Sequence, residues 1–85
     1  MSIAPNPATS WATVDYFLPV SSKVSLEILT MDGQVVSSLL DQQIAAKGTH
    51  QINLDIQHLT SGTYIIHLIT DQTVLAESLV VVEDW

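Results

Sequence analysis

The stretch Thr63–Thr70, with the sequence TYIIHLIT, decides the fold of this chain. Its apolar side chains recur with the period of two that is typical of a β-strand, and not with the 3.6 of a helix. One face carries Tyr64, Ile66 and Leu68, and the other carries Ile65, His67 and Ile69. Because both faces are apolar, we predict that this stretch is a central strand, covered on both sides.

The segments around this stretch predict turns and further strands. Leu59–Gly62 (LTSG) reads as the turn that leads into it, so we expect a positive φ at Gly62 and, less strongly, at Gly33. Lys23–Ile28 (KVSLEI) alternates between apolar and polar residues, as a half-buried strand does. Asp32-Gly33 is a hairpin signal, and Gln34–Leu40 is the expected return strand.

The rest of the chain follows the same pattern. Thr49–Leu54 alternates again, and Thr73–Val82 returns as the closing strand after a tight turn. Trp11–Leu18 reads as extended, whereas Asp41–Lys47 reads as a polar break between strands. Strands of this length and spacing predict one all-β domain over residues 1–85, an immunoglobulin-like antiparallel β-sandwich of about seven strands.

The alternation also predicts the core. We expect the side chains of one face of each strand to point inward, namely Val24, Leu26, Ile28, Val36, Ile52, Leu54, Tyr64, Ile66, Leu68, Leu79 and Val81.

The composition excludes several partners. Lys23 and Lys47 are opposed by nine carboxylates, and the formal net charge is −7. Phosphate recognition depends on Lys and Arg, so we expect no binding to nucleic acid, and an anionic membrane surface is an equally poor partner. The chain has no cysteine, which excludes disulfides, a thiol nucleophile and cysteine-based metal sites.

The start of the chain carries no targeting segment. Met1 is followed by neither a basic region nor an apolar run, so we expect no signal peptide. The longest apolar run, Leu79–Val82, is too short to span a bilayer, and we expect no direct membrane insertion. We interpret Met1 as a start placed on a domain excised from a longer protein.

The segment Pro5–Thr9 (PNPAT) predicts a rigid lead-in to the first long strand. Proline fixes its own φ and biases the preceding residue toward extended conformations, so this segment should not be helical. Asn6 is expected to form an Asx-type bond to the backbone just after it.

The sequence gives little support for a catalytic site or a metal site. The histidines His50, His58 and His67 fall on two strands and in a turn, and we expect His50 and His67 to point to opposite faces. Ser61 lies in a turn outside any G-x-S-x-G motif, which argues against a nucleophile. We therefore predict a domain that is not an enzyme, with no cofactor and no metal.

The aromatic residues leave a second class of function open. Trp11 and Tyr16 could form a platform on which sugar rings stack, which would make the chain a cell-surface adhesion or carbohydrate-binding module. The alternative is that one of these aromatics packs over the edge of the sandwich.

Several motifs together resemble one family. In chain order they are Pro5–Thr9 (PNPAT), Val24–Ile28 (VSLEI), Gly33 with Val36, Gly48–Ile52 (GTHQI), Leu59–Tyr64 (LTSGTY) and Leu79–Val82 (LVVV). Their order and spacing resemble the C-terminal sorting domain of the type IX secretion system of Bacteroidetes bacteria. The positions that carry the motif are Pro5, Asn6, Pro7, Gly33, Gly48, Gly62 and Tyr64.

The resemblance implies a sandwich at the C-terminus of a large exported passenger, with residues 1–7 as the junction between the two. It implies partners among secretion proteins of the periplasm and outer membrane. It also implies transit through the periplasm to the cell surface or the extracellular space, where a sortase can remove the domain.

The resemblance places recognition in the closing strand, at Glu77, Ser78, Leu79, Val80, Val81 and Val82. We expect the strand's edge to be unpaired and open to strand addition, with Val80 and Val82 pointing outward. Alternatively, these valines cover the outer face of a sheet or form an edge-strand dimer. The family usually has an aspartate where this chain has Thr30, a lysine near Glu77-Ser78, and a basic end where this chain has Glu83-Asp84-Trp85.

Overall fold

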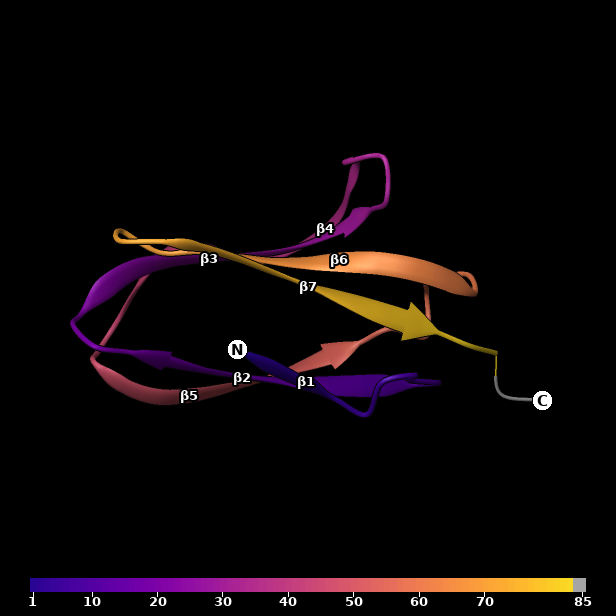
Figure 1. Cartoon of the computed structure of the whole chain (residues 1–85), viewed down its shortest axis with the longest axis horizontal. Helices are drawn as coiled ribbons and strands as arrows, with labels where there is room; N and C mark the ends of the chain where they lie inside the picture. Colours follow the sequence, from indigo (N-terminus) through magenta and orange to yellow (C-terminus); the bar gives the residue numbers. More distant parts are fainter. Residues whose placement is uncertain (84–85) are drawn as a thin grey trace.

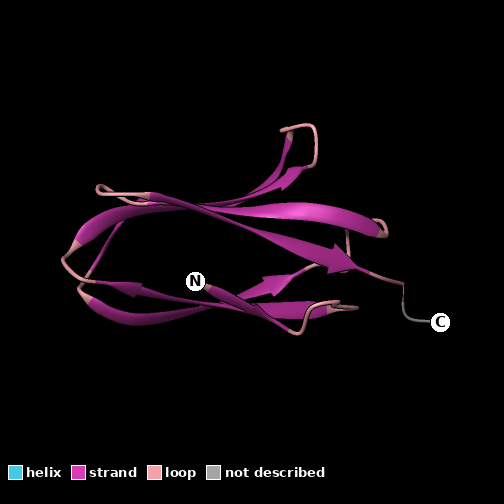
Figure 2. Cartoon of the chain, in the orientation of Figure 1, coloured by secondary structure: helices cyan, strands magenta, loops and turns pink. Residues whose placement is uncertain are grey.

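The computed structural model describes residues 1–83, which form strands joined by turns and contain no helix (Figure 2). The seven strands are β1 (Ser2–Ala4), β2 (Trp11–Leu18), β3 (Ser22–Thr30), β4 (Val35–Ala45), β5 (Gly48–Asp55), β6 (Gly62–Ile69) and β7 (Val74–Val81). The all-β fold predicted from the alternating pattern is therefore confirmed.

The strands form two antiparallel sheets that pack face to face as a sandwich (Figure 1). One sheet has the order β1-β2-β5 and the other has the order β4-β3-β6-β7. β6 lies between β3 and β7, so the prediction of a central strand from TYIIHLIT is confirmed. β7 lies at an edge of the four-stranded sheet, which makes the closing strand an edge strand.

The core lies between the sheets and is formed by alternate residues of each strand. Nine of the residues predicted to face inward are buried: Val24, Leu26, Ile28, Leu54, Tyr64, Ile66, Leu68, Leu79 and Val81. Ile52 only packs against this cluster, and the prediction for Val36 is wrong because its side chain is 38% exposed. β4 is an edge strand, and its position leaves Val36 outside the space between the sheets.

The core also contains side chains that were not predicted from the sequence. They come mainly from β2 and from the segments next to strands, namely Ala8, Ala12, Val14, Tyr16, Leu18 and Ile56. The signal was present in β2, where Ala12, Val14, Tyr16 and Leu18 alternate with outward residues. A small alanine and an amphipathic tyrosine weaken the hydrophobic contrast of this pattern.

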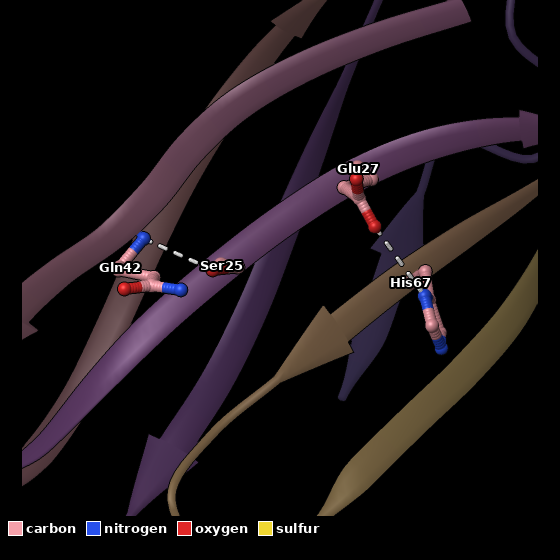
Figure 3. A network of polar contacts seen from close by, with 4 residues as sticks. All are labelled: Ser25, Glu27, Gln42 and His67. Carbon is pink, nitrogen blue, oxygen red and sulfur yellow. Dashed lines mark hydrogen bonds and ion pairs between the residues drawn. The ribbon is translucent and has the colours of Figure 1, made fainter. Parts of the chain in front are cut away.

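The prediction of a polar break at Asp41–Lys47 is wrong, because β4 continues to Ala45. Gln42 has a φ of 51°, and the β3–β4 register shifts along the pair, as occurs at β-bulges. The backbone N–H of Gln42 donates to Ser25 Oγ over 3.0 Å (Figure 3). Gln42 and its neighbours are exposed, so this part of the edge strand has no alternation that a pattern could reveal.

The β3–β4 turn is organised by Thr30. Its hydroxyl donates to the Asp32 carboxylate, and the Gln34 N–H donates to Thr30 Oγ1 over 3.1 Å. The Thr30 hydrogen bond is the main cause that lowers the pKa of Asp32. Gly33 closes the turn with a φ of 94°, which confirms the hairpin expected from Asp32-Gly33.

Candidate functional site

The closing strand, β7, presents its side chains as the alternation predicts. Leu79 and Val81 are buried in the core. Val80 is half-buried on the outer face of the sheet, and Val82, just beyond the strand, is 38% exposed. Glu77 and Ser78 are exposed, so four of the six predicted recognition residues carry side chains that a partner can reach.

The outer edge of β7 is covered by residues from the start of the chain. We call Pro5–Ala8 the N-terminal clamp. Asn6 Nδ2 donates to the carbonyl of Ser78 over 3.0 Å, and the Val80 N–H donates to Asn6 Oδ1 over 3.0 Å. The prediction of a local Asx-type bond at Asn6 is therefore wrong, because both partners lie more than 70 residues away along the chain.

Ala8 continues the clamp with its own backbone. The Ala8 N–H donates to the Val80 carbonyl over 2.8 Å, and the Val82 N–H donates to the Ala8 carbonyl over 2.9 Å. Ala8 is also 1% exposed, so it adds a side chain to the core beneath β7. The expectation of an unpaired edge is therefore wrong between Ser78 and Val82.

The sequence of the clamp explains why a side chain takes part in the pairing. Pro5 and Pro7 have no backbone N–H, so this segment cannot donate to a regular ladder at these positions. The primary amide of Asn6 has one acceptor oxygen and two N–H donors, and it therefore replaces a peptide group in the pairing. The prolines hold the backbone while the asparagine supplies the missing donor.

The clamp covers only part of the strand. Among residues 1–83, no segment pairs with the outer edge of β7 between Val74 and Glu77. Ser2–Ala4 pairs with Thr13–Asp15, so β1, which precedes the prolines, is part of the three-stranded sheet.

The other motif positions lie at turns and strand starts. Gly48 begins β5, and Gly62 begins β6 with a φ of 157°, so the expected positive value is confirmed. The Tyr64 hydroxyl donates to the carbonyl of Thr60 over 2.7 Å, while its ring is buried. This bond ties the turn before β6 to the core, in the manner of the tyrosine corner of immunoglobulin-like domains.

Comparison with known families agrees with this geometry. Residues 2–82 match the model of the family described as "Secretion system C-terminal sorting domain". The chain belongs to this family. A search of curated proteins finds no match to it.

The sorting domains of this family are C-terminal signals for type IX secretion and are in general not enzymes. Membership implies interaction with that secretion system and export to the cell surface or the extracellular space. No helix in residues 1–83 is long and apolar enough to cross a membrane.

The histidines of the sorting domain do not meet. His50, in the three-stranded sheet, stacks on Tyr16 with 5.3 Å between ring centroids. His67 and Glu27 both lie in the four-stranded sheet, where His67 Nδ1 is 3.6 Å from Glu27 Oε1 (Figure 3). His58 is exposed in the turn after β5. Within the described part of the chain, no three His, Cys, Asp or Glu side chains gather as a metal site.

Trp11 and Tyr16 do not form the platform that the sequence left open as an alternative. The two residues lie on opposite faces of β2, because their positions differ by an odd number. Tyr16 points into the core, and burial raises the pKa of its hydroxyl. Trp11 points outward and is 56% exposed. Phe17, which we did not single out from the sequence, projects from the same outer face of β2.

Proposed function

We propose that this chain is the C-terminal domain of a larger exported protein, and that secretion machinery recognises its closing strand. Membership of the sorting-domain family supports this proposal. The residues that we assign to recognition are Glu77, Ser78, Leu79, Val80, Val81 and Val82.

The observation that supports this assignment is that successive side chains of the strand alternate between the core and the outside. Leu79 and Val81 are buried and support the core, whereas Val80 and Val82 face away from it. Val82 is 38% exposed and lies two positions from the half-buried Val80, so the two valines form an apolar pair on the outside of the strand. A partner that binds beside β7 would cover both valines.

The N-terminal clamp decides how such a partner can approach. Because Asn6 and Ala8 already bond the backbone of Ser78, Val80 and Val82, recognition there proceeds through side chains. A partner strand, or a second copy pairing edge to edge, would first have to displace the clamp. Strand addition without displacement is limited to Val74–Glu77.

The start of the chain also indicates where the passenger joins it. We propose that the passenger joins the chain at or before Ser2, because β1 is part of the three-stranded sheet. The exported protein would cross the periplasm and reach the surface, where a sortase would cut before β1. Cleavage there leaves both sheets of the sorting domain intact.

The test is a reporter protein joined to the N-terminus of this chain in a bacterium with a type IX secretion system. We expect the reporter to reach the medium or the cell surface. The double variant Val80→Thr, Val82→Thr should reduce this export several-fold, because threonine keeps the β-branched shape and removes the apolar contact.

The matched control is Val35→Thr, Val36→Thr on β4. These valines are 47% and 38% exposed but lie at the opposite edge of the same sheet. The control should be exported like the parent. Thermal melts of the isolated domains must show that both variants fold. A folded Val80→Thr, Val82→Thr variant that is exported as well as the parent refutes recognition through these valines.

A further inference from the structure

The outer face of the three-stranded sheet carries two exposed aromatic side chains in one line. Trp11 and Phe17 are 56% and 66% exposed, and both project from the outward side of β2. They are six positions apart on one strand, which corresponds to about 20 Å. Neither ring belongs to the core, because β2 contributes the side chains of its other face to the core.

Between the two aromatics lies a row of polar side chains from β2 and β5. Thr13 Oγ1 donates to Asn53 Oδ1 over 3.1 Å, and Gln51 Nε2 donates to Asp15 Oδ1 over 2.9 Å. Each bond joins residues that are directly opposite in the β2–β5 register. The bonds hold the four side chains in position. They leave free for a ligand the Asn53 amide N–H groups, the Gln51 oxygen and the second oxygen of Asp15.

A surface hollow lies at one end of this row. Its volume is about 430 Å³, and it is lined by Trp11, Thr13 and Asn53. One aromatic ring, one hydroxyl and one amide therefore border the same space. An apolar wall with a few placed polar groups is the usual composition of a ligand site.

We propose that this face binds a neutral polysaccharide that lies along β2. The face of an aromatic ring carries negative charge density and attracts the C–H groups of a sugar ring stacked on it. The side chains of Thr13, Asp15, Gln51 and Asn53 bind hydroxyl groups between the two rings. An extended oligosaccharide contacts both Trp11 and Phe17, whereas a single sugar contacts only one.

Charge favours a neutral ligand. The ionisable side chains on the outward positions of β2 and β5 are Asp15 and Asp55, both carboxylates. The whole chain has a formal net charge of −7. An acidic polysaccharide would be repelled, whereas hydroxyl groups donate readily to a carboxylate.

The arrangement of the face disfavours a protein partner. The core of a protein–protein interface is depleted in charged residues and well packed. Here the two aromatics are separated by polar and acidic side chains that are already paired across the strands. The face is also on a different sheet from β7, so this proposal and the proposed function can fail independently.

The first experiment uses Trp11 as the reporter. The chain has two tryptophans, so in the variant Trp85→Phe the tryptophan fluorescence comes from Trp11 alone. This variant is titrated with cellohexaose, laminarihexaose, xylohexaose and mannohexaose, with glucose, and with hexagalacturonate as the acidic probe. We expect a saturable fluorescence change with at least one neutral hexasaccharide, and none with glucose or the acidic probe.

Calorimetry on the parent chain and its variants locates the site. Trp11→Ala should weaken binding at least tenfold and Phe17→Ala several-fold, while both variants keep the thermal midpoint of the parent within a few degrees. Met31→Ala is the matched control, because Met31 is 64% exposed at the β3–β4 turn and far from this face in the sheet order; it should leave binding unchanged.

Three results would overturn the proposal. The first is the absence of saturable binding to every neutral hexasaccharide, and the second is equal binding of hexagalacturonate. The third is binding that Trp11→Ala leaves unchanged. Sedimentation at the same concentrations adds a fourth: a dimer of the parent that Trp11→Ala abolishes would assign the face to self-association instead.

Discussion

The two sheets present different outer faces. The three-stranded sheet shows a polar row between two exposed aromatics, with hydrogen bonds from β2 to β5. The four-stranded sheet shows an apolar face in which Leu29 lies opposite Ile65, and Ile69 lies opposite Val74. Its centre holds a single ionisable pair, Glu27 and His67 (Figure 3).

The difference shows that the two faces are suited to different tasks. Leu29, Ile65 and Ile69 are half-buried by their neighbours, so apolar cross-strand contacts stabilise the sheet that holds β7. The side chains of the other face pair through hydrogen bonds across the strands, and the proposed ligand would bind the groups that these bonds leave free. Three comparisons between the sheets and one within the four-stranded sheet test this interpretation.

The largest effect is expected for leucines of the shared core. Leu26 on β3 and Leu54 on β5 are both completely buried, one from each sheet. Leu26→Ala and Leu54→Ala should each lower the free energy of unfolding by about 2–5 kcal/mol, because both leave a cavity in the same core. Urea denaturation followed by circular dichroism measures this. A large loss for only one of them would mean that the sheets are not stabilised by a common core.

The two asparagines of the chain provide the second comparison. Asn6 bonds the backbone of β7, whereas Asn53 bonds a side chain on the exposed face. Asn6→Ala should cost about 1–3 kcal/mol because it removes two hydrogen bonds to the backbone of β7, each with a net contribution of about 0.5–1.5 kcal/mol. Asn53→Ala should cost less than about 0.5 kcal/mol, as is usual at the surface.

Hydrogen exchange tests the asparagine comparison at a single amide. The amide of Val80 should lose protection in Asn6→Ala and keep it in Asn53→Ala. If Asn6→Ala left both the unfolding free energy and the exchange of Val80 unchanged, the clamp would not hold the edge of the four-stranded sheet.

The third comparison concerns glycines in the four-stranded sheet. Gly33 has a φ of 94° and Gly62 a φ of 157°. Gly33→Val should therefore cost about 1–3 kcal/mol, because a β-branched residue is strained in this region. Gly62→Val should cost a similar amount, because its φ also lies in a region where L side chains are strained. Thermal melts compare the two, and Gly33→Asn, which tolerates positive φ, is the control. A thermal midpoint that Gly62→Val leaves unmoved would contradict the turn assignment.

The smallest effect is expected for the carboxylates of the two outer faces. Glu27→Gln on the four-stranded sheet and Asp15→Asn on the three-stranded sheet should each change the free energy of unfolding by less than about 0.5–1 kcal/mol, because surface ion pairs and hydrogen bonds contribute little. Only Asp15→Asn should weaken binding of a neutral hexasaccharide. Equal effects of both variants on sugar binding would remove the distinction between the faces.

The alternation of side chains was enough to predict much of the fold. In β3 and β6, Leu26, Ile28, Ile66 and Leu68 stand at every second position, and burial follows this period directly. Leu79 and Val81 were placed in the core for the same reason. The prediction failed at Val36 and in Asp41–Lys47, where an edge strand and its bulge leave the residues exposed and remove the periodic signal.

The sequence by itself determined the class of fold, the inward residues of the central strands and the turns at Gly33 and Gly62, because these depend on local conformation and period. Only the tertiary structure decided what Asn6 bonds and which face of β2 is turned to the core. The partners of Asn6 lie 72 and 74 residues away, and a local pattern contains no information about them. Trp11 and Phe17 are exposed while Tyr16 is buried, because packing between the two sheets decides which side of β2 faces the core.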